Sequence, residues 1–312
     1  MLNYNLGYAC INTELSSRKV KVSTNRTMRR KTFDEKGLDY VSEIILQNVT
    51  DLLTILEWNA ENNIHFYRMS SEMFPWASEY ALEDLKDFDK IEEALFKAGL
   101  FAEENDIRLT THPGPFNKLC SPNEQVVQNT IRDLEIHGKM MDLLCQPRSP
   151  WAKINIHVGG AYNDKPMALG NFCRNFARLS EAVRSRLTVE NDDKESLYST
   201  KELYDGVFKV IGIPIVHDYH HHTMCTGGLT QQEAVELALT TWGDVVPVVH
   251  YSQSRAIEHN DPKIKPQAHS DSYWEPIDTF GHRMDIMLEC KHKELGLFKM
   301  RELMFPHCIA AK

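Results

Sequence analysis

The fold is decided by residues 187–218, which read LTVENDDKESLYSTKELYDGVFKVIGIPIVHD. The stretch opens with a short apolar, β-branched run, Leu187–Glu190, and closes with another, Pro214–Asp218. Between them, Ser199-Thr200-Lys201-Glu202 offers a capping hydroxyl followed by a glutamate, which predicts a helix over Thr200–Ile211. A strand, a helix and a second strand in this order predict parallel strands joined by a right-handed crossover.

This strand–helix pattern recurs along the whole chain. Eight apolar runs are predicted strands: Tyr4–Tyr8, Ile64–Ser70, Ile107–Thr111, Lys153–His157, Leu187–Glu190, Pro214–Asp218, Val245–His250 and Asp285–Glu289. Amphipathic segments between them are predicted helices: Leu38–Asn62, Phe88–Asn105, Asn123–Leu144, Leu169–Arg184, Thr200–Ile211 and Thr230–Thr240. Eight parallel strands favour a closed barrel over an open sheet, so the sequence predicts an α/β protein with a (β/α)8 TIM barrel.

The chain shows no internal repeat, low-complexity tract or linker, and residues 1–312 are therefore predicted to form a single TIM-barrel domain. A barrel of about 250 residues that has grown by insertions accounts for this length. The longest segments predicted to be irregular are Ala9–Lys36 and Ser252–Phe280, and irregular segments of such length are usually functional or disordered.

Composition excludes several classes of protein. The sequence has no window of 18 apolar residues, so no membrane span is expected, and Met1–Asn5 does not begin a secretion signal. The seven cysteines are scattered without a Cys-x-x-Cys pair, which argues against a disulfide scaffold or a thiolate zinc site. We expect a cytoplasmic protein, and no feature indicates a protein partner or an oligomer, so a monomer is expected.

The residues that end the predicted strands are the main clue to chemistry. In a barrel of this kind the active site lies at the carboxyl ends of the strands. Tyr8 and Arg68 lie at or near the ends of the first two strands. The other six strands end in a histidine or a carboxylate: His112, His157, Glu190, Asp218, His250 and Glu289. One such residue is usually a turn residue, but six that converge on one end of a barrel predict a metal site.

Two further histidines extend this set. Asp218-Tyr219-His220-His221 is an Asp-x-x-His element, in which one turn of chain can present Asp218 and His221 together. His269 lies in the long segment before the last strand. Eight ligands exceed the need of one ion, so two or three divalent ions are predicted. Mixed imidazole and carboxylate ligands without thiolate suit Mn²⁺ or Zn²⁺, whereas Mg²⁺ would want fewer imidazoles.

The formal net charge of −9 argues against a nucleic-acid partner, but the distribution of charge matters more than the sum. Between Leu15 and Phe33 the chain has seven cations and no acid: Arg18, Lys19, Lys21, Arg26, Arg29, Arg30 and Lys31. A multi-metal cluster in a barrel typically hydrolyses a phosphodiester or binds a sugar for isomerisation. The basic run favours phosphodiester hydrolysis over sugar isomerisation.

These residues resemble the UV damage endonucleases, a family related in fold to endonuclease IV. The resemblance runs from about Leu6 to Gly296. It is carried by short motifs in a fixed order: Leu6–Asn12, Thr24–Arg29, Tyr67–Ser71, Thr111–Gly114, Ile156–Tyr162, Val189–Asp193, His217–His222, His250–Gln253, Ala268-His269 and Met287–Glu294.

The resemblance implies a DNA repair endonuclease. Such enzymes recognise cyclobutane pyrimidine dimers and 6-4 photoproducts in duplex DNA and cut the backbone immediately 5′ to the lesion. It also implies that manganese is the favoured metal, with zinc or magnesium as alternatives, and that Glu190, Asp218 and Glu289 are catalytic. The metal ligands that it implies are His112, His157, Glu190, Asp218, His221, His250, His269 and Glu289.

Damaged duplex DNA is thus the expected partner, in the nucleoid if the source is a prokaryote. Tyr8 and Asn12 would line the lesion pocket, where a poorly stacked dimer costs less to flip than normal bases. Asn25, Arg26 and Arg29 would contact phosphates, which position DNA without reading its sequence. Lys291, after the last strand, would do the same.

The sequence departs from the family pattern at three places. Many members have Gln-Tyr where this chain has Pro115-Phe116; Phe116 can still stack or insert, but Pro115 lacks the amide, so an altered or broader lesion range is expected. Some members have a lysine where Val248 stands, and some have a histidine where Glu72 stands. Glu72 is therefore a further candidate ligand or supporting residue.

Three alternatives to a UV damage endonuclease stay open. The loss of Gln-Tyr favours an endonuclease that acts at abasic sites. A metal-dependent sugar isomerase on the same barrel would not need the basic run Arg18–Lys31 or salt-sensitive DNA affinity. A DNA-binding module without catalysis does not explain a complete ligand set.

Overall fold

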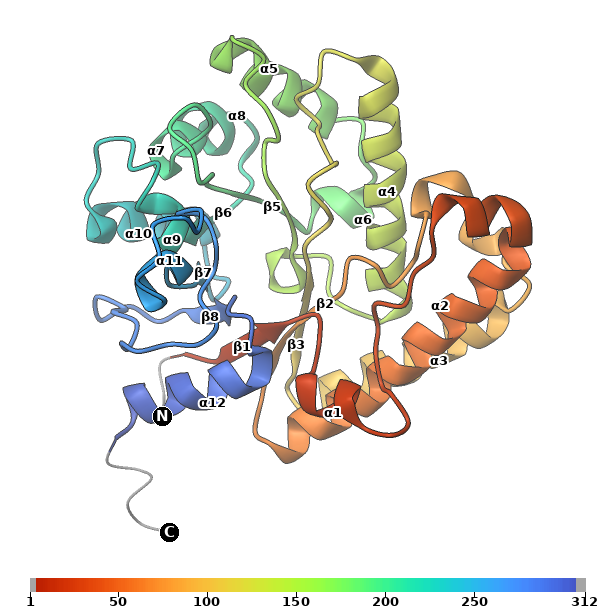
Figure 1. Cartoon of the computed structure of the whole chain (residues 1–312). Coiled ribbons are helices and arrows are strands. Elements are labelled where there is room, and N and C mark those ends of the chain that lie inside the picture. Colours follow the sequence, from red (N-terminus) through yellow and green to blue (C-terminus); the bar gives the residue numbers. More distant parts are fainter. Residues whose placement is uncertain (1–3, 307–312) are drawn as a thin grey trace. The chain divides into compact units, whose positions relative to one another are not determined.

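A computed structural model describes residues 4–306 of the chain (Figure 1). Met1–Asn3 and Cys308, which contributed to the expectations about secretion and disulfides, lie outside these residues. The strands are parallel, and their order around a closed barrel follows the sequence from β1 to β8. The predicted (β/α)8 barrel is thus confirmed, and all eight strands were predicted in the right places.

The strands are short, and nearly every residue in them is buried. They are β1 (Leu6–Ala9), β2 (Phe66–Met69), β3 (Arg108–Thr111), β4 (Ile154–Ile156), β5 (Leu187–Glu190), β6 (Ile215–Asp218), β7 (Val248–Tyr251) and β8 (Asp285–Leu288).

The longer helices follow the strands and form the outer layer. They are α2 (Arg30–Glu61), α3 (Phe88–Glu104), α4 (Glu124–Leu143), α5 (Lys165–Phe176), α10 (Gln231–Leu239) and α12 (Lys293–Met304). Shorter helices are α1 (Thr13–Ser17), α6 (Glu181–Arg184), α7 (Thr200–Leu203), α8 (Lys209–Ile211), α9 (Tyr219–His222) and α11 (Arg255–Glu258). Single turns of other helix types are η1 (Ala77–Glu79), η2 (Leu82–Asp84), η3 (Pro150–Ala152), η4 (Tyr204–Phe208) and η5 (Thr240–Trp242).

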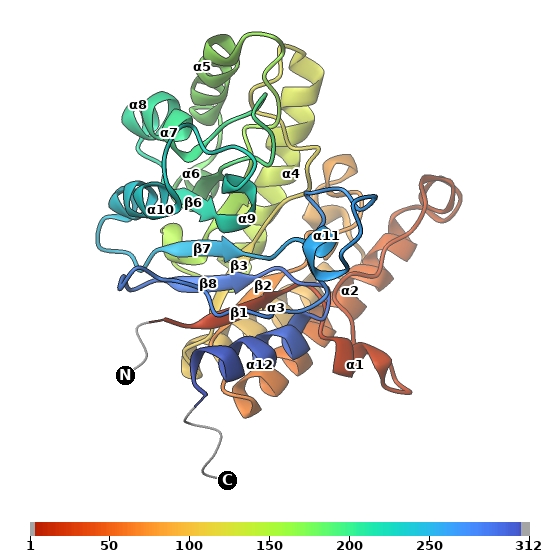
Figure 2. The same ribbon diagram turned by 60° about the vertical axis from the view of Figure 1, so that its left-hand side comes forward.

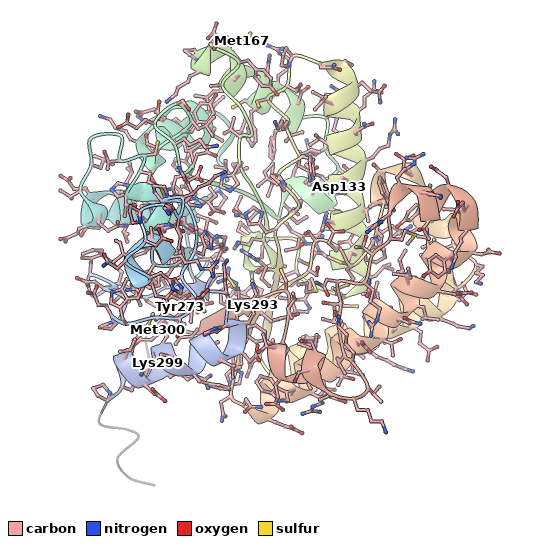
Figure 3. The ribbon with its side chains drawn as sticks, viewed as in Figure 1. Asp133, Met167, Tyr273, Lys293, Lys299 and Met300 are labelled. Carbon is pink, nitrogen blue, oxygen red and sulfur yellow. The ribbon has the colours of Figure 1, made fainter. Side chains whose placement is uncertain are left out.

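The described chain divides into two compact units, which we call the C-terminal unit (residues 4–9 and 189–306) and the N-terminal unit (residues 10–188). In the C-terminal unit β8 pairs with β7 on one side and with β1 on the other. Helix α12 lies along β1 in both views (Figures 1 and 2). Gly296 of α12 is needed where the helix passes the residues that flank β8, because a Cβ there would lie 2.0 Å from Cys290 Sγ and 3.4 Å from the ring of Tyr273, which Figure 3 labels.

In the N-terminal unit β2 pairs with β3, and β3 pairs with β4. Helices α2 and α3 run side by side and bury apolar rows against each other and the strands (Figure 2). Leu52 and Leu95 are completely buried examples from the two helices. Burial of this kind is worth about 25 cal/mol per Å² of apolar surface and is the main stabilising contribution in each unit.

Several helix predictions were wrong in their limits. Helix α2 begins at Arg30 rather than Leu38. Its first segment, before Gly37, is joined to the main helix by a kink, and Gly37 can form this kink because glycine tolerates a positive φ, here 64°. The predicted irregular segment Ala9–Lys36 therefore contains α1 and the start of α2. The predicted helix Leu169–Arg184 is two helices, since the chain is extended at Ser180, whose backbone N–H bonds Glu135.

Other differences concern the C-terminal half. The predicted helix Thr200–Ile211 contains a π-helical turn, η4. Helix α12 was not predicted, although its buried residues Leu297 and Met300 have helical spacing. The segment Ser252–Phe280 contains α11 and an antiparallel bridge between Ser254 and His269. None of the helices within residues 4–306 has the length and apolar character needed to cross a membrane.

His217 of β6 shows how the strands are fixed to the helix layer. Its Nδ1 lies 2.9 Å from Thr200 Oγ1, and its Nε2 lies 2.6 Å from the amide nitrogen of Gln231. The ring is fully buried, and burial lowers the pKa of His217 well below its usual value. These two contacts anchor β6 to the helices that follow β5 and β6.

We expect this neutral histidine to make stability pH-dependent. Because its pKa is depressed in the folded state, its contribution is complete above the unfolded pKa of about 6.5 and is lost as the pH falls below it, by up to about 1.4 kcal/mol per pH unit. His217→Gln should flatten the fall in unfolding free energy between pH 7 and pH 5, measured by urea denaturation in chelator. An unchanged slope in His217→Gln would contradict the assignment.

Candidate metal centre

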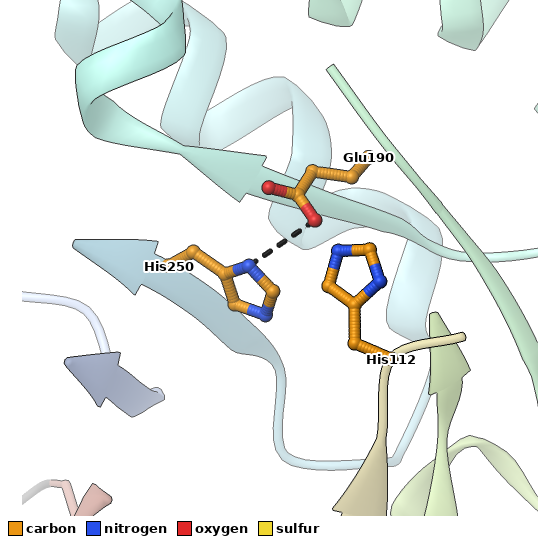
Figure 4. A group of neighbouring side chains, drawn as sticks. All are labelled: His112, Glu190 and His250. Carbon is orange, nitrogen blue, oxygen red and sulfur yellow. Dashed lines mark ion pairs between the residues drawn. The ribbon is translucent and has the colours of Figure 1, made fainter. Parts of the chain in front are cut away.

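Carboxylates and a histidine meet at the carboxyl ends of β5 to β8 in the C-terminal unit. His250 Nδ1 lies 3.1 Å from Glu190 Oε2 and 3.1 Å from Glu289 Oε1, and Figure 4 shows the first of these contacts. Asp218, His250 and Glu289 each offer a ligand atom, and the three atoms lie within 4.8 Å of one another. Three carboxylates within reach of one imidazole make a concentrated, buried negative charge.

His221 and His269 join this group from outside the strands. Asp218 caps helix α9 by accepting a hydrogen bond from the backbone N–H of His221 at 2.8 Å, so the predicted turn presents both residues together. His221 Nδ1 lies 3.5 Å from Glu190 Oε1, and His269 Nδ1 lies 3.6 Å from Glu289 Oε2. Six of the eight predicted ligands thus lie together in the C-terminal unit.

The other two predicted ligands lie together in the N-terminal unit. His112 directly follows β3, and His157 directly follows β4. Their rings face each other with centroids 5.5 Å apart. Nδ1 of His112 is 3.2 Å from the carbonyl oxygen of Pro113.

The backbone fixes which ring nitrogen is available on three of these histidines. Nδ1 of His221 donates to the carbonyl oxygen of Asn191 at 2.9 Å, and Nδ1 of His269 donates to that of Glu289 at 2.8 Å. His112 is held in the same way by Pro113. A neutral imidazole that donates from one nitrogen keeps a lone pair on the other, which is the usual arrangement of metal-ligating histidines.

The environment of Asp218 tests whether a cation fits. The carboxylate is completely buried, and its Oδ2 has no hydrogen-bond partner among residues 4–306. Burial raises the pKa of Asp218; the imidazole of His221 acts against this, whereas the carboxylates of Glu190 and Glu289 add to it. A divalent cation would satisfy the buried oxygen and favour the ionised form. The residues therefore fit a divalent metal ion.

The neighbouring histidines have other roles. His220 packs its ring edge-on against His269, with centroids 5.8 Å apart. His222 Nε2 lies 3.1 Å from the carbonyl oxygen of Leu229. Glu72, the further candidate, is an exposed side chain in the turn after β2. The packing of His220 against a predicted ligand was not foreseen, because adjacent histidines in a sequence give no sign of which will face which neighbour.

Two residues predicted to contact the lesion are buried. Tyr8 lies in β1 with no exposed surface. Asn12 is 1% exposed, and its side chain accepts the backbone N–H of Leu15 as the N-cap of α1. Asn12 therefore has a structural role in this conformation, and a direct DNA contact by either residue stays a prediction.

The predicted phosphate-binding arginines differ from each other. Arg26 is half-buried and is held by Asp51 at 2.7 Å and by the carbonyl oxygen of Lys21 at 2.9 Å. Asn25 accepts a hydrogen bond from Ser23, close to Arg26. The Arg29 side chain is exposed, and no ion-pair partner for it occurs in the described part of the chain.

The basic run as a whole is less positive than its sequence suggests. Arg18 pairs with Glu14, Lys31 with Glu35, and Arg30 with both Asp34 and Glu79. Among residues 4–306, the cations of the run without such a partner are Lys19, Lys21 and Arg29. The sequence analysis did not predict these ion pairs because the acids lie outside the run of residues 15–33.

The remaining predicted DNA contacts are exposed. Phe116 is 87% exposed, and Pro115 beside it is also exposed, in the segment after β3. Lys291 is exposed after β8. An aromatic ring left so far in solvent has no packing role in the described structure and is free to stack on another molecule.

The fold and this cluster place the chain among TIM-barrel proteins with a candidate metal centre at the carboxyl ends of the strands. The sequence model of the UV-endonuclease UvdE family matches residues 4–309, and the chain belongs to this family. The predicted family is thereby confirmed.

Relatives of known sequence agree with the assignment. A UV-damage endonuclease of Schizosaccharomyces pombe is 36% identical over 97% of this chain, and a UV DNA damage endonuclease of Clostridium perfringens is 32% identical over 94% of it. The match covers 51% of the first relative and 69% of the second, so the chain spans about half the length of the fungal protein.

A solved structure, that of SacUVDE, superimposes with a TM-score of 0.83 at 30% identity and covers 97% of this chain and 98% of the other. A D-tagatose 3-epimerase-like protein superimposes with a TM-score of 0.56 at 15% identity over 81% of this chain and 91% of the other. The second likeness shows the shared barrel fold alone.

Removing one ligand should separate metal binding from folding. We expect Asp218→Asn to weaken Mn²⁺ binding by about 100-fold or more, since changes around a metal site commonly cost 10- to 100-fold. The metal-free variant should unfold at the same or a higher temperature, because a buried charge is removed while the cap to His221 is kept. Isothermal titration calorimetry of chelator-treated protein measures the affinity, and differential scanning calorimetry measures the unfolding temperature.

Asp271→Asn provides the matched control. Asp271 lies with Glu258 and His259 in a half-exposed group away from β6, and it accepts a 2.7 Å hydrogen bond from His259. This variant should bind Mn²⁺ as the wild type does. Wild-type affinity in Asp218→Asn, or an equal loss in Asp271→Asn, would overturn the proposed centre.

Proposed function

We propose that this chain is a metal-dependent DNA repair endonuclease that hydrolyses the phosphodiester bond immediately 5′ to UV photolesions in duplex DNA. The lesions are cyclobutane pyrimidine dimers and 6-4 photoproducts. The observation that carries the proposal is the buried cluster of Glu190, Asp218, His250 and Glu289 in a chain of the UV-endonuclease family. We further propose that residues 1–312 act as one domain, as a monomer, and in the cytoplasm if the source is a prokaryote.

The proposed metal ligands are the six residues of the C-terminal unit together with His112 and His157. Six of the eight lie at the end of a strand or directly after one. The other two, His221 and His269, are held by hydrogen bonds to such residues, His221 to Asp218 and His269 to Glu289. Two or three divalent ions, with Mn²⁺ favoured over Zn²⁺ and Mg²⁺, would supply the Lewis acidity that phosphodiester hydrolysis needs.

The protein's own residues would position and insulate this chemistry. Glu190, Asp218 and Glu289 are the proposed catalytic carboxylates; Glu190 and Asp218 are almost completely buried, so bulk water cannot weaken their field. The carbonyl oxygens of Asn191 and Glu289 hold the rings of His221 and His269 in one orientation. The ligand atoms are thus fixed before the substrate arrives, which lowers the reorganisation needed for reaction.

DNA recognition is proposed to combine charge and stacking. Exposed Arg29, Lys291 and the lysines at 19 and 21 would contact phosphates, and Phe116 would fill the gap that a displaced lesion leaves. We also propose that five further residues lie near the bound DNA: Tyr8, Asn12, Asn25, Arg26 and Pro115. The half-buried Arg26 would act mainly by holding the loop of Arg29 through Asp51.

Two alternatives are separable by experiment. An endonuclease for abasic sites would use the same metal centre, and Pro115-Phe116 in place of Gln-Tyr favours a broad lesion range. A sugar isomerase on this barrel is favoured by no observation beyond the fold, since the epimerase-like structure is only 15% identical.

The first test is incision of DNA. Metal-loaded protein should nick UV-irradiated plasmid in the presence of Mn²⁺ and leave unirradiated plasmid intact, whereas Glu190→Gln should reduce nicking by about 100-fold or more with its fold unchanged. Oligonucleotides with one thymine dimer or one abasic site map the cut. Equal cutting of irradiated and unirradiated DNA, or cutting at abasic sites alone, would refute the proposal.

The second test concerns the arginines. Arg29→Ala should weaken binding to all duplexes alike and lower the slope of log K against log salt by about 1, as expected for one lost phosphate contact. Arg26→Ala should instead lower the unfolding free energy by about 1 kcal/mol, because Asp51 loses its half-buried partner. An unchanged salt slope in Arg29→Ala would remove this residue from the DNA interface.

A further inference from the structure

The exposed ring of Phe116 is carried by a tight four-residue turn in the segment after β3. The backbone N–H of Asn117 donates to the carbonyl oxygen of Gly114 at 3.1 Å and closes the turn around Pro115 and Phe116. Pro115 takes the second position of the turn, where its ring fixes φ and favours this conformation. Pro115-Phe116, the pair that departs from the family pattern, is thus the tip of a turn with little freedom of its own.

Asn117 joins this turn to helix α4, on which Figure 3 labels Asp133. Asn117 is 7% exposed, and its side-chain nitrogen donates to Asp133 Oδ2 at 2.7 Å and to the carbonyl oxygen of Gly114 at 3.1 Å. Hydrogen bonds to an ionised acceptor are shorter and stronger than those between neutral groups. The side chain of Asn117 therefore closes the turn a second time and ties it to a charged group on a long helix.

Two further neighbours confine the residues at the base of the turn. The backbone N–H of Lys118 donates at 2.9 Å to Oγ1 of Thr130, which precedes Asp133 on α4 by about one helical turn. Gly159, in the segment after β4, packs against the same residues: a Cβ there would lie 2.8 Å from Lys118 Cγ and 3.2 Å from the carbonyl oxygen of Asn117. The base of the turn is thus packed, whereas its tip is open to solvent.

Asp133 is itself connected to strand β3. Its Oδ2 lies 3.9 Å from Nε2 of His137, a buried residue one turn further along α4, and Nδ1 of the same ring lies 3.2 Å from Thr111 Oγ1. Thr111 ends β3 and directly precedes the proposed ligand His112. A chain of polar contacts thus runs from the turn of Phe116 to a strand end of the barrel, all within the N-terminal unit.

We propose that Asp133 is a positioning residue for Phe116. Through Asn117 it holds the turn in one conformation, so that the ring is presented to the duplex already oriented. A ring on a loose loop would lose its conformational freedom at the moment of insertion, whereas a group held in its bound conformation binds more tightly because that entropy is lost beforehand. The inference rests on the proposed function for what Phe116 meets, but the order of the turn is a property of the free protein.

Amide ¹⁵N relaxation of Phe116 tests the order of the turn without DNA. In the chelator-treated full chain labelled with ¹⁵N-phenylalanine, the wild-type order parameter should be that of a rigid backbone, about 0.85, and Asp133→Ala should lower it to about 0.6 or less. Asn117→Ala, which removes the same hydrogen bond from the side of the turn, should have the same effect. Asp133→Asn keeps an oxygen that accepts from Asn117 and should keep the wild-type value.

Asp142→Ala is the matched control, because it removes a carboxylate of α4 that pairs with Arg148 and Arg186 rather than with the turn. It should lower the unfolding free energy and leave the order of Phe116 unchanged. A wild-type order parameter in Asp133→Ala and Asn117→Ala, or an equal loss of order in Asp142→Ala, would overturn the inference.

Incision assays distinguish this inference from the proposed function. With Mn²⁺ affinity equal to wild type, Asp133→Ala should lower kcat/KM on a dimer-containing duplex about tenfold, and Asp133→Asn should restore it. Added to Phe116→Ala, Asp133→Ala should cause no further loss, because the two residues act as one unit; losses that multiply would overturn the positioning role. Loss of order at Phe116 in an Asp133→Ala protein whose wild type does not cut irradiated DNA would refute the function and support the positioning of Phe116 by Asp133.

Discussion

The burial of three carboxylates around His250 is the constraint on which the rest of the site depends. Glu190, Asp218 and Glu289 approach one another at the ends of three strands, and two of them are almost completely removed from water. Burial is the main cause of the raised pKa of Asp218, and repulsion from the carboxylates of Glu190 and Glu289 adds to it. A divalent cation would offset both effects, so the feature that weakens the metal-free fold is the one that supports the proposed metal centre.

Hydrogen bonds to the backbone, rather than additional charged side chains, hold the residues of this cluster in place. The Asp218 side chain caps α9, and main-chain carbonyls orient the rings of His221 and His269. His217, one residue before the cap, anchors β6 to the helices through Thr200 and Gln231. Asp218, His221 and His269 are thus positioned by neighbours that themselves have fixed places in the fold, which is the geometric precision that the proposed metal centre needs.

The surface cations of residues 15–33 are mostly neutralised by ion pairs. The chain is acidic overall, and most cations of the segment 15–33 are paired with acids that flank the segment or, for Asp51 and Glu79, lie further along the N-terminal unit. Pairs of this kind are worth little as stabilising interactions, but they reduce the positive potential that the sequence suggests. The few unpaired cations and the exposed ring of Phe116 are left as the groups that can meet another molecule.

The sequence by itself determined the barrel and the residues that stand at the ends of its strands. Period-two and period-3.6 patterns are local, and parallel strands place their carboxyl ends on one side, so strand-end residues such as Glu190 and His250 could be chosen without coordinates. Helix limits were less accurate: the kink at Gly37 comes from its positive φ, and the break at Ser180 includes a hydrogen bond to the distant Glu135. Only the tertiary structure decided that Arg26 pairs with Asp51, that Arg30 also reaches Glu79, and that Tyr8 and Asn12 are buried. These contacts join residues far apart in the chain, and no local pattern of residues records them.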